Sequence, residues 1–308
     1  MEEYSRRGFS GFLLALLFRP GRGSNVAPPQ TNPAGTAVAS TSRTTVRRYR
    51  ADAVILIFGI PIYRLAAVGG GQVSVEETGE GAQMRRTLFF AAGSDPKRAH
   101  GFKRLGWIRE VVLGPGPAPV EVDYFGVLTS SPEESLEHAR KSIAAPQSGR
   151  NLYSAVNGRN TAGHSRSAVT HFEFTADANW ADQALIAQAR STFEANARWR
   201  ETSWPASPDH APPTFLLQLA TLLQQRARRA AGPYVYNEQE YLLELEASPR
   251  SASPAAPVAV RGRIRNQRTR YVTAFRLWTE NSPGAIVPVR FEFQPRAFLR
   301  LTFEALPG

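Results

Sequence analysis

The closing part of the chain alternates apolar and polar side chains with a period of two. Val258, Val260 and Ile264 take turns with arginines, and the segment 297–305 alternates in the same manner. Successive side chains of a β-strand point to opposite faces of its sheet, so this period predicts strands with one apolar and one polar face. A chain with several such segments must form a sheet that buries its apolar face.

Strand patterns occur on both sides of a helical block in the middle of the chain. The predicted strands span 46–58, 72–76, 85–91, 107–113, 120–125, 165–174, 234–247, 258–265, 269–278, 286–293 and 297–305. Helical spacing predicts helices over 131–143, 180–197 and 215–230, the last with Leu216, Leu219, Ala220 and Leu223 on its buried side. Runs of strands before and after helices favour the α+β class, here a long, curved antiparallel sheet with helices grouped mid-chain.

The first residues resemble an export signal. Arg6 and Arg7 precede a short apolar stretch ending at Phe18, which is too short to span a bilayer. The arginine pair after Ser5 resembles the twin-arginine signal of bacteria, which implies transport of an already folded protein by the twin-arginine export machinery. We therefore expect an export signal over 1–20, a flexible Pro-, Gly- and Ser-rich linker over 21–45 and a single α+β domain over 46–308.

The composition limits the kinds of catalytic and binding site that the protein can contain. The 308 residues include no Cys, which excludes thiol nucleophiles, disulfides and cysteine-bound metal or iron–sulfur centres. The net charge of +11 invites a nucleic-acid interpretation, but residues 1–50 hold eight Arg and two Glu, so the remainder is only mildly basic. The five His form no zinc-ligand pattern, and we predict neither a metal site nor a cofactor.

Two glycine-rich segments look like nucleotide motifs but lack their context. The segment from Gly158 to Ser165 has the glycine spacing of a phosphate-binding loop, with His164 where the Lys should be, and it leads into a strand instead of a helix. Gly69, Gly70 and Gly71 lack dinucleotide-binding spacing, so we expect a sheet turn or bulge there.

Arginines concentrate near the end of the chain. The candidate binding residues are Arg261, Arg263, Arg265, Arg268, Arg270 and Tyr271. Neighbouring strands can place several guanidinium groups on one sheet surface, where like charges require an acidic strand, an anionic lipid, a glycan or a nucleic acid opposite them. His171 and Glu173 lie two apart on a predicted strand and share a face, which makes them a candidate acid–base or binding pair.

The closing motifs carry a resemblance of architecture. Pro288-Val289-Arg290-Phe291-Glu292-Phe293, followed by Phe298-Leu299-Arg300-Leu301, ends a strand-rich chain with helices midway. Over 46–305 this arrangement is similar to periplasmic lipoprotein-carrier-like proteins and related exported families of unknown function. The resemblance implies a half-barrel sheet that partly wraps helices or an apolar ligand. It transfers no functional residue.

Three functions remain open on the sequence. The first is an exported, non-enzymatic protein of the bacterial periplasm that binds a lipid, another amphiphile or an envelope component. The second is an exported hydrolase or lyase acting on an anionic glycan, with arginines holding the substrate and His171, Glu173 or Tyr271 in acid–base roles. The third is a basic nucleic-acid-binding protein. The first requires an apolar concavity beside the helices, and the second requires these groups to converge on one cleft.

Overall fold

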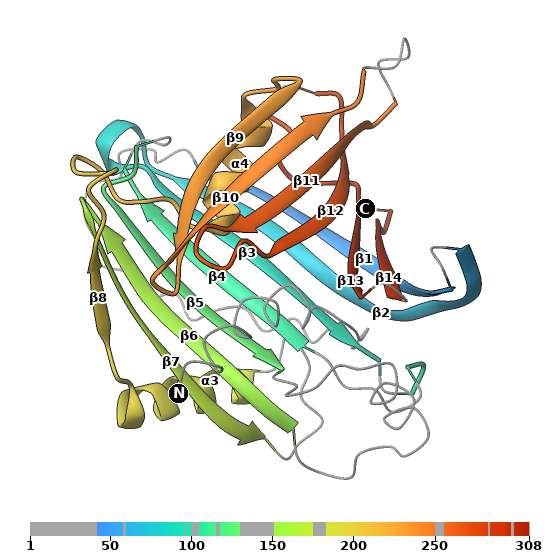
Figure 1. The fold of residues 1–308 in the computed structure, drawn as a ribbon, viewed down its shortest axis with the longest axis horizontal. Helices are drawn as coiled ribbons and strands as arrows, with labels where there is room; N and C mark the ends of the chain where they lie inside the picture. The colour runs from blue at the N-terminus through green and yellow to red at the C-terminus, as the bar shows by residue number, and fades with distance from the viewer. Residues whose placement is uncertain are drawn as a thin grey trace.

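The computed structural model describes residues 42–57, 60–95, 97–99, 105–114, 118–129, 151–174, 183–249, 256–282, 284–296 and 299–307. Within these residues one antiparallel sheet of 14 strands dominates the molecule (Figure 1). This confirms the predicted long antiparallel sheet with helices mid-chain, and the protein is mostly β. The predicted helix over 131–143 and the export signal with Arg6 and Arg7 lie outside the described residues.

The strands divide into two series. The first comprises β1 (Ser42–Ile57), β2 (Ile60–Thr78), β3 (Arg85–Ser94), β4 (Leu105–Leu113), β5 (Glu121–Thr129), β6 (Asn151–Thr161), β7 (His164–Phe174) and β8 (Arg200–Ser203). The second comprises β9 (Arg229–Tyr236), β10 (Gln239–Ala247), β11 (Val258–Asn266), β12 (Val272–Thr279), β13 (Arg290–Arg296) and β14 (Leu299–Ala305). A 3-10 turn, η1 (Gly81–Gln83), and the helices α3 (Gln183–Asn196) and α4 (Phe215–Gln224) complete the elements.

The first and last strands meet in the middle of the sheet. The spatial order is β8-β7-β6-β5-β4-β3-β2-β1-β14-β13-β12-β11-β10-β9. Tyr49 of β1 lies opposite Ala305 of β14, and Ile55 lies opposite Leu299. Each half of the sheet is therefore a meander of antiparallel neighbours, and the β1–β14 ladder joins the halves.

The two described helices cover opposite faces. Leu217 of α4 packs with Val75, Leu88 and Val112 on the concave face. Leu185, Ala189 and Phe193 of α3 instead pack with Trp107, Val127 and Tyr153 on the other face. Part of the central strands is thus buried on both faces, as at Trp107 and Ile108 of β4 and at Val127 and Leu128 of β5.

The sheet curls until its β9–β10 end lies over β5–β7, with α4 inside the curl (Figure 1). The Asn237 amide donates to the Tyr124 hydroxyl at 3.1 Å, and the Ser167 hydroxyl donates to the Glu238 carboxylate at 2.8 Å. The rings of Tyr124 and Tyr236 lie 4.9 Å apart. These contacts between strands far apart in the sheet hold a half-barrel shape.

Several expected boundaries were wrong. The segment 234–247 is two strands, because Asn237 and Glu238 both adopt positive φ angles, 48° and 57°, and form a two-residue hairpin turn. The helix predicted to reach residue 230 ends at Gln224, and the chain from Arg229 onward instead pairs with β10 as strand β9. Strands β6 and β8 were not predicted.

The buried side of α4 also differs from the prediction. Its buried residues are Leu217, Gln218, Ala220 and Leu222. Leu216 and Leu219 are partly exposed and face a hollow described below. The helical period was correct but its inward direction was shifted, because α4 is short and covered on two sides by the curled sheet.

The glycine segments are structural. The three glycines from Gly69 lie inside β2, directly after a bulge that breaks the β1–β2 register between Ala51 and Ala53. A Cβ at Gly70 would lie 2.7 Å from the Tyr49 carbonyl oxygen, so only Gly lets the strands approach there. Gly163, with φ +67°, lies in the β6–β7 turn, so the loop with phosphate-loop spacing forms a hairpin.

Candidate functional site

Charged side chains form a row across the face of β9–β13 opposite α4. In register, Arg229 of β9 faces Glu246 of β10, which in turn faces Arg261 of β11. Arg261 faces Arg276 of β12, and Arg276 faces Glu292 of β13. The row therefore alternates in sign except at Arg261 and Arg276, where two guanidinium groups on adjacent strands are direct neighbours.

This row lines a groove of about 740 Å³ on the outer face of the sheet. Its charged lining consists of Arg229, Glu244, Glu246, Arg261, Arg263, Arg276, Glu292 and Arg300. We call this set the outer groove. Five arginines against three glutamates leave it with a net positive charge.

Part of this charge is neutralised within the protein. Arg229 pairs with Glu246 at 3.0 Å, Arg265 with Glu244 at 3.4 Å, and Arg290 with Glu292 at 2.6 Å. The Arg229 pair lowers the pKa of Glu246 through a hydrogen bond and the guanidinium charge. Among the described residues, Arg261, Arg263, Arg276 and Arg300 form no ion pair, although the Arg261 guanidinium lies close enough to Glu246 to help lower the pKa of that carboxyl.

The structure separates the predicted binding residues. Arg261 and Arg263 lie in the outer groove, and Arg265 lies beside it in its pair with Glu244. Arg268, Arg270 and Tyr271 belong to the β11–β12 connection, which does not line the groove. The Asn266 carboxamide oxygen accepts hydrogen bonds from the amides of Arg268 and Thr269 and shapes this turn.

His171 and Glu173 lie on β7, away from the arginines. His171 Nδ1 is 2.8 Å from the Ser154 hydroxyl, and burial lowers the pKa of the imidazole. The Glu173 backbone oxygen accepts a hydrogen bond from the Gln188 side chain of α3. Within the described residues, no group of three His, Asp or Glu side chains has metal-binding geometry.

An apolar hollow lies between α4 and the concave face of the sheet. Its volume is about 120 Å³. Its apolar lining includes Phe215, Leu216 and Leu219 from α4, Val73 and Phe90 from β2 and β3, and Phe275, Leu277, Phe291 and Phe303 from the second series of strands. The rings of Phe291 and Phe303 stack with centroids 4.3 Å apart. We call this set the α4 hollow.

A buried carboxylate holds α4 in place beside this hollow. Glu110 of β4 is fully buried and accepts hydrogen bonds from the amides of Leu216 at 3.0 Å and Leu217 at 2.9 Å, and from the Thr214 hydroxyl. It thus satisfies the free amides at the helix start. Burial raises the Glu110 pKa to about 7 although these hydrogen bonds oppose the shift. The sequence signal was an acidic residue on the same face as Ile108 and Val112.

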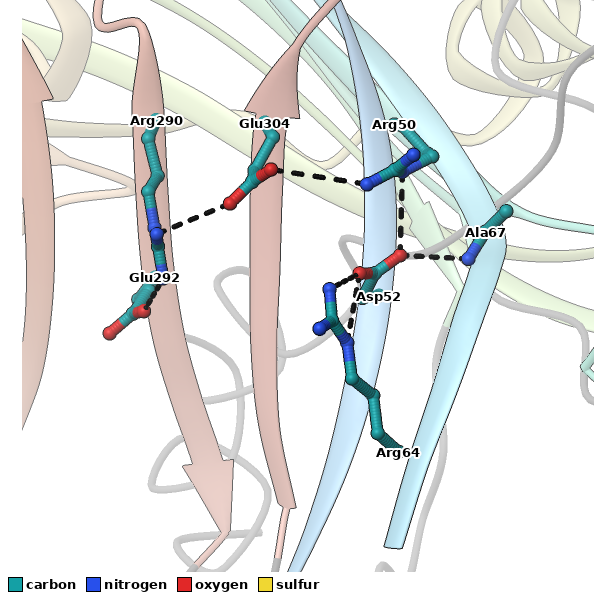
Figure 2. A network of polar contacts seen from close by, with 7 residues as sticks. All are labelled: Arg50, Asp52, Arg64, Ala67, Arg290, Glu292 and Glu304. Atoms are coloured by element: carbon teal, nitrogen blue, oxygen red, sulfur yellow. Dashed lines mark hydrogen bonds and ion pairs between the residues drawn. The ribbon is translucent and has the colours of Figure 1, made fainter. Parts of the chain in front are cut away.

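A second buried carboxylate lies in the bulge of β1 and β2 (Figure 2). Asp52 is 2% exposed, accepts the Ala67 amide at 2.7 Å and pairs with Arg64 and Arg50. Burial raises the Asp52 pKa, but the Ala67 hydrogen bond and the Arg64 guanidinium outweigh it and keep the pKa below its usual value. A further pocket of about 420 Å³ adjoins this network.

Comparisons with known proteins give no information on the function of this chain. No family model matches the chain, and no curated protein matches it. One solved structure that superposes on it is a β-barrel-like protein of the domain of unknown function DUF1849 from Brucella abortus. That chain is 8% identical, with a TM-score of 0.39 over 86% of this chain and 98% of that one. A superposition at this level supports no transfer of function.

The structure itself therefore defines the class. The protein is a mostly β protein built on one open antiparallel sheet, with a basic groove on one face and a small apolar hollow under a helix on the other. None of the described helices is long and apolar enough to cross a membrane.

Proposed function

We propose that the protein binds an amphiphilic ligand, with the apolar part of the ligand in the α4 hollow. The observation that carries this proposal is the hollow itself, whose side walls are aromatic and aliphatic side chains from α4 and from both series of strands. Filling such a space removes apolar surface from water and stabilises the complex by about 25 cal/mol for each Å² buried.

The size of the hollow limits what enters it. Pockets that enclose drug-sized ligands usually measure about 300–1,000 Å³, whereas the α4 hollow measures about 120 Å³. The hollow therefore takes one end of an acyl chain or a single ring, and the polar remainder of the ligand stays in water. This arrangement suits an amphiphile better than a wholly apolar molecule.

We further propose that the protein works in the periplasm or outside the bacterial cell. The support is the paired Arg6 and Arg7 before a short apolar stretch. Fractionation of cells with N-terminal sequencing of the protein tests this. Recovery of the uncleaved chain in the cytoplasm alone would overturn this localisation and leave the nucleic-acid alternative ahead.

The arrangement of the candidate residues matches ligand binding better than catalysis. The proposed glycan hydrolase or lyase needed His171, Glu173 or Tyr271 to converge with the arginines on one cleft. His171 and Glu173 lie on β7, Tyr271 lies in the β11–β12 connection, and none of them lines the outer groove. The arrangement therefore favours a protein that holds a ligand without transforming it.

Titration with a fluorescent fatty acid tests ligand binding directly. In L219W the indole fills the α4 hollow, so we expect at least a tenfold loss of probe affinity compared with the wild type. The control L306W places the same side chain at an exposed position near the chain end, 47% exposed, and should leave affinity unchanged. Wild-type protein that carries no extractable lipid and does not bind the probe would refute the proposal.

A further inference from the structure

We propose that the outer groove is a binding site for an acidic polysaccharide chain, such as a polymer of uronic acids. This site lies on the face of the sheet opposite the α4 hollow and stands independently of the proposed amphiphile binding. Three observations carry it: the neighbouring arginines that form no ion pair among the described residues, the carboxylates interspersed with them, and the absence of aromatic rings on this face among the described groove residues.

The arginines are placed at an energetic cost. Like charges directly opposite each other on adjacent strands destabilise a sheet, and Arg261 and Arg276 occupy such positions without an ion pair among the described residues. The Nε of Arg300 is also buried, and no described residue forms a hydrogen bond with it. An anion seated in the outer groove reduces the cost of the Arg261–Arg276 repulsion, because it screens the two charges and accepts hydrogen bonds from their exposed guanidinium donors.

The spacing suits a ligand with repeated charges. Adjacent strands lie about 4.8 Å apart, and residues two apart on one strand are separated by about 6.8 Å. Arg261 and Arg276 are neighbours across β11 and β12, and Arg263 lies two residues from Arg261. Three guanidinium groups can therefore meet successive acidic groups of one extended chain, each through paired hydrogen bonds.

The carboxylates point to a ligand that also donates hydrogen bonds. Glu244, Glu246 and Glu292 line the same groove. They repel a polymer that carries only phosphates, but they accept hydrogen bonds from hydroxyl groups. A chain of sugars with carboxylates and hydroxyls on each unit complements both kinds of side chain.

The groove lacks the means to recognise bases. Single-stranded nucleic acids usually stack their bases on exposed aromatic rings. The aromatic residues at the groove are Phe275 and Phe293, and both also line the α4 hollow. The Phe275 ring covers Gly262 on the α4 side, and Phe293 is 5% exposed in the main core. The chemistry of the groove thus favours a polysaccharide over a nucleic acid.

Calorimetric titration of the full chain with polygalacturonate at 0.15 M salt tests the proposal. We expect the double variant R261Q/R276Q to lose at least tenfold in affinity. The matched control R198Q/R200Q removes the same charge from exposed arginines outside the groove and should change affinity less than twofold. Thermal unfolding of each variant verifies that the proteins are folded.

Parallel titrations with neutral dextran and a single-stranded oligonucleotide distinguish the ligand class. Binding of polygalacturonate but not of dextran, with weaker binding of the oligonucleotide, supports the assignment. Preferential binding of the oligonucleotide overturns it in favour of a nucleic-acid partner. Equal losses in the groove and control variants also overturn it, because binding then depends on net charge alone. No binding of polygalacturonate to the wild type refutes it outright.

Discussion

Glu110 connects the sheet to α4 through a single side chain. Its pKa is raised from 4.5 to about 7 by burial. In the folded protein it therefore retains a proton over a pH range in which the unfolded chain has lost it. Stability from this group is fully present below about pH 4.5 and decreases as the pH rises towards 7, with a total loss of about 3 kcal/mol.

We expect E110Q to lack this pH dependence. Chemical denaturation at pH 5 and pH 7.5 measures the free energy of unfolding of the variant and the wild type. The wild type should lose more stability between these values than E110Q does. The control E240Q, at an exposed position of β10, should follow the wild type. Parallel pH profiles for E110Q and the wild type would contradict the assignment.

Which single residues come together in the groove and in the hollow was the hardest feature to predict from the sequence. The sequence identified Arg261 and Arg263 as binding candidates because their alternation with apolar residues was visible, and the structure places both in the outer groove. Arg276 and Arg300 belong to the same arginine-rich stretch of sequence but were not among the candidate binding residues, because their place in the groove depends on the register of β11–β14. Phe215 and Phe303 line the same α4 hollow only after the sheet curls, and no local sequence pattern encodes this arrangement.

The bulged β1–β2 hairpin depends on one buried charge. The pKa of Asp52 is held below its usual value because the Ala67 hydrogen bond and the Arg64 guanidinium outweigh the effect of burial. A carboxyl of this kind stabilises the fold above the unfolded-state pKa near 3.8, and this contribution disappears as the pH falls through the lower folded-state value. The dependence is opposite in sign to that of Glu110.

We expect D52N to lose about 2 kcal/mol at pH 7, because the amide cannot replace a charge-assisted hydrogen bond. At low pH the wild type should converge on the variant, since both side chains are then neutral. Urea denaturation at pH 7 and at the lowest pH at which the wild type remains folded measures this. A constant difference between the two proteins at both pH values would argue against an ionised Asp52.

Strands and helices with a clear hydrophobic period were predicted from the sequence. Those whose bounds depend on contacts with residues distant in sequence were not. The alternation around Val260 and Ile264 was sufficient to place β11 and its inward face. The β9–β10 hairpin was read as one strand because Asn237 and Glu238 lack a glycine, the usual signal of a turn with two positive φ angles. Strand β6 is polar along much of its length and carries a weak apolar pattern.

At the scale of the molecule, formation of the single sheet depends on the β1–β14 ladder, which joins its two halves. A chain ending after Arg296 lacks β14 and exposes the edges of β1 and β13 in the middle of the apolar core. We expect it to aggregate or remain unfolded, because unpaired internal edges recruit other strands. Size-exclusion chromatography and circular dichroism measure this outcome. A chain ending at Ala305 keeps the whole ladder and should fold, and a monomeric, folded product from the shorter chain would contradict the prediction.

Because Tyr49 pairs with Ala305, synthesis imposes an order on assembly. During translation β1 is made long before its neighbour β14, so one of its edges stays unpaired while the intervening strands are produced. The sheet can therefore be completed only after β14 has been made, and until then the nascent chain needs protection from other chains. The yield of folded protein on overproduction should then depend on how fast the chains pair β1 with β14, more than on the stability of the folded protein.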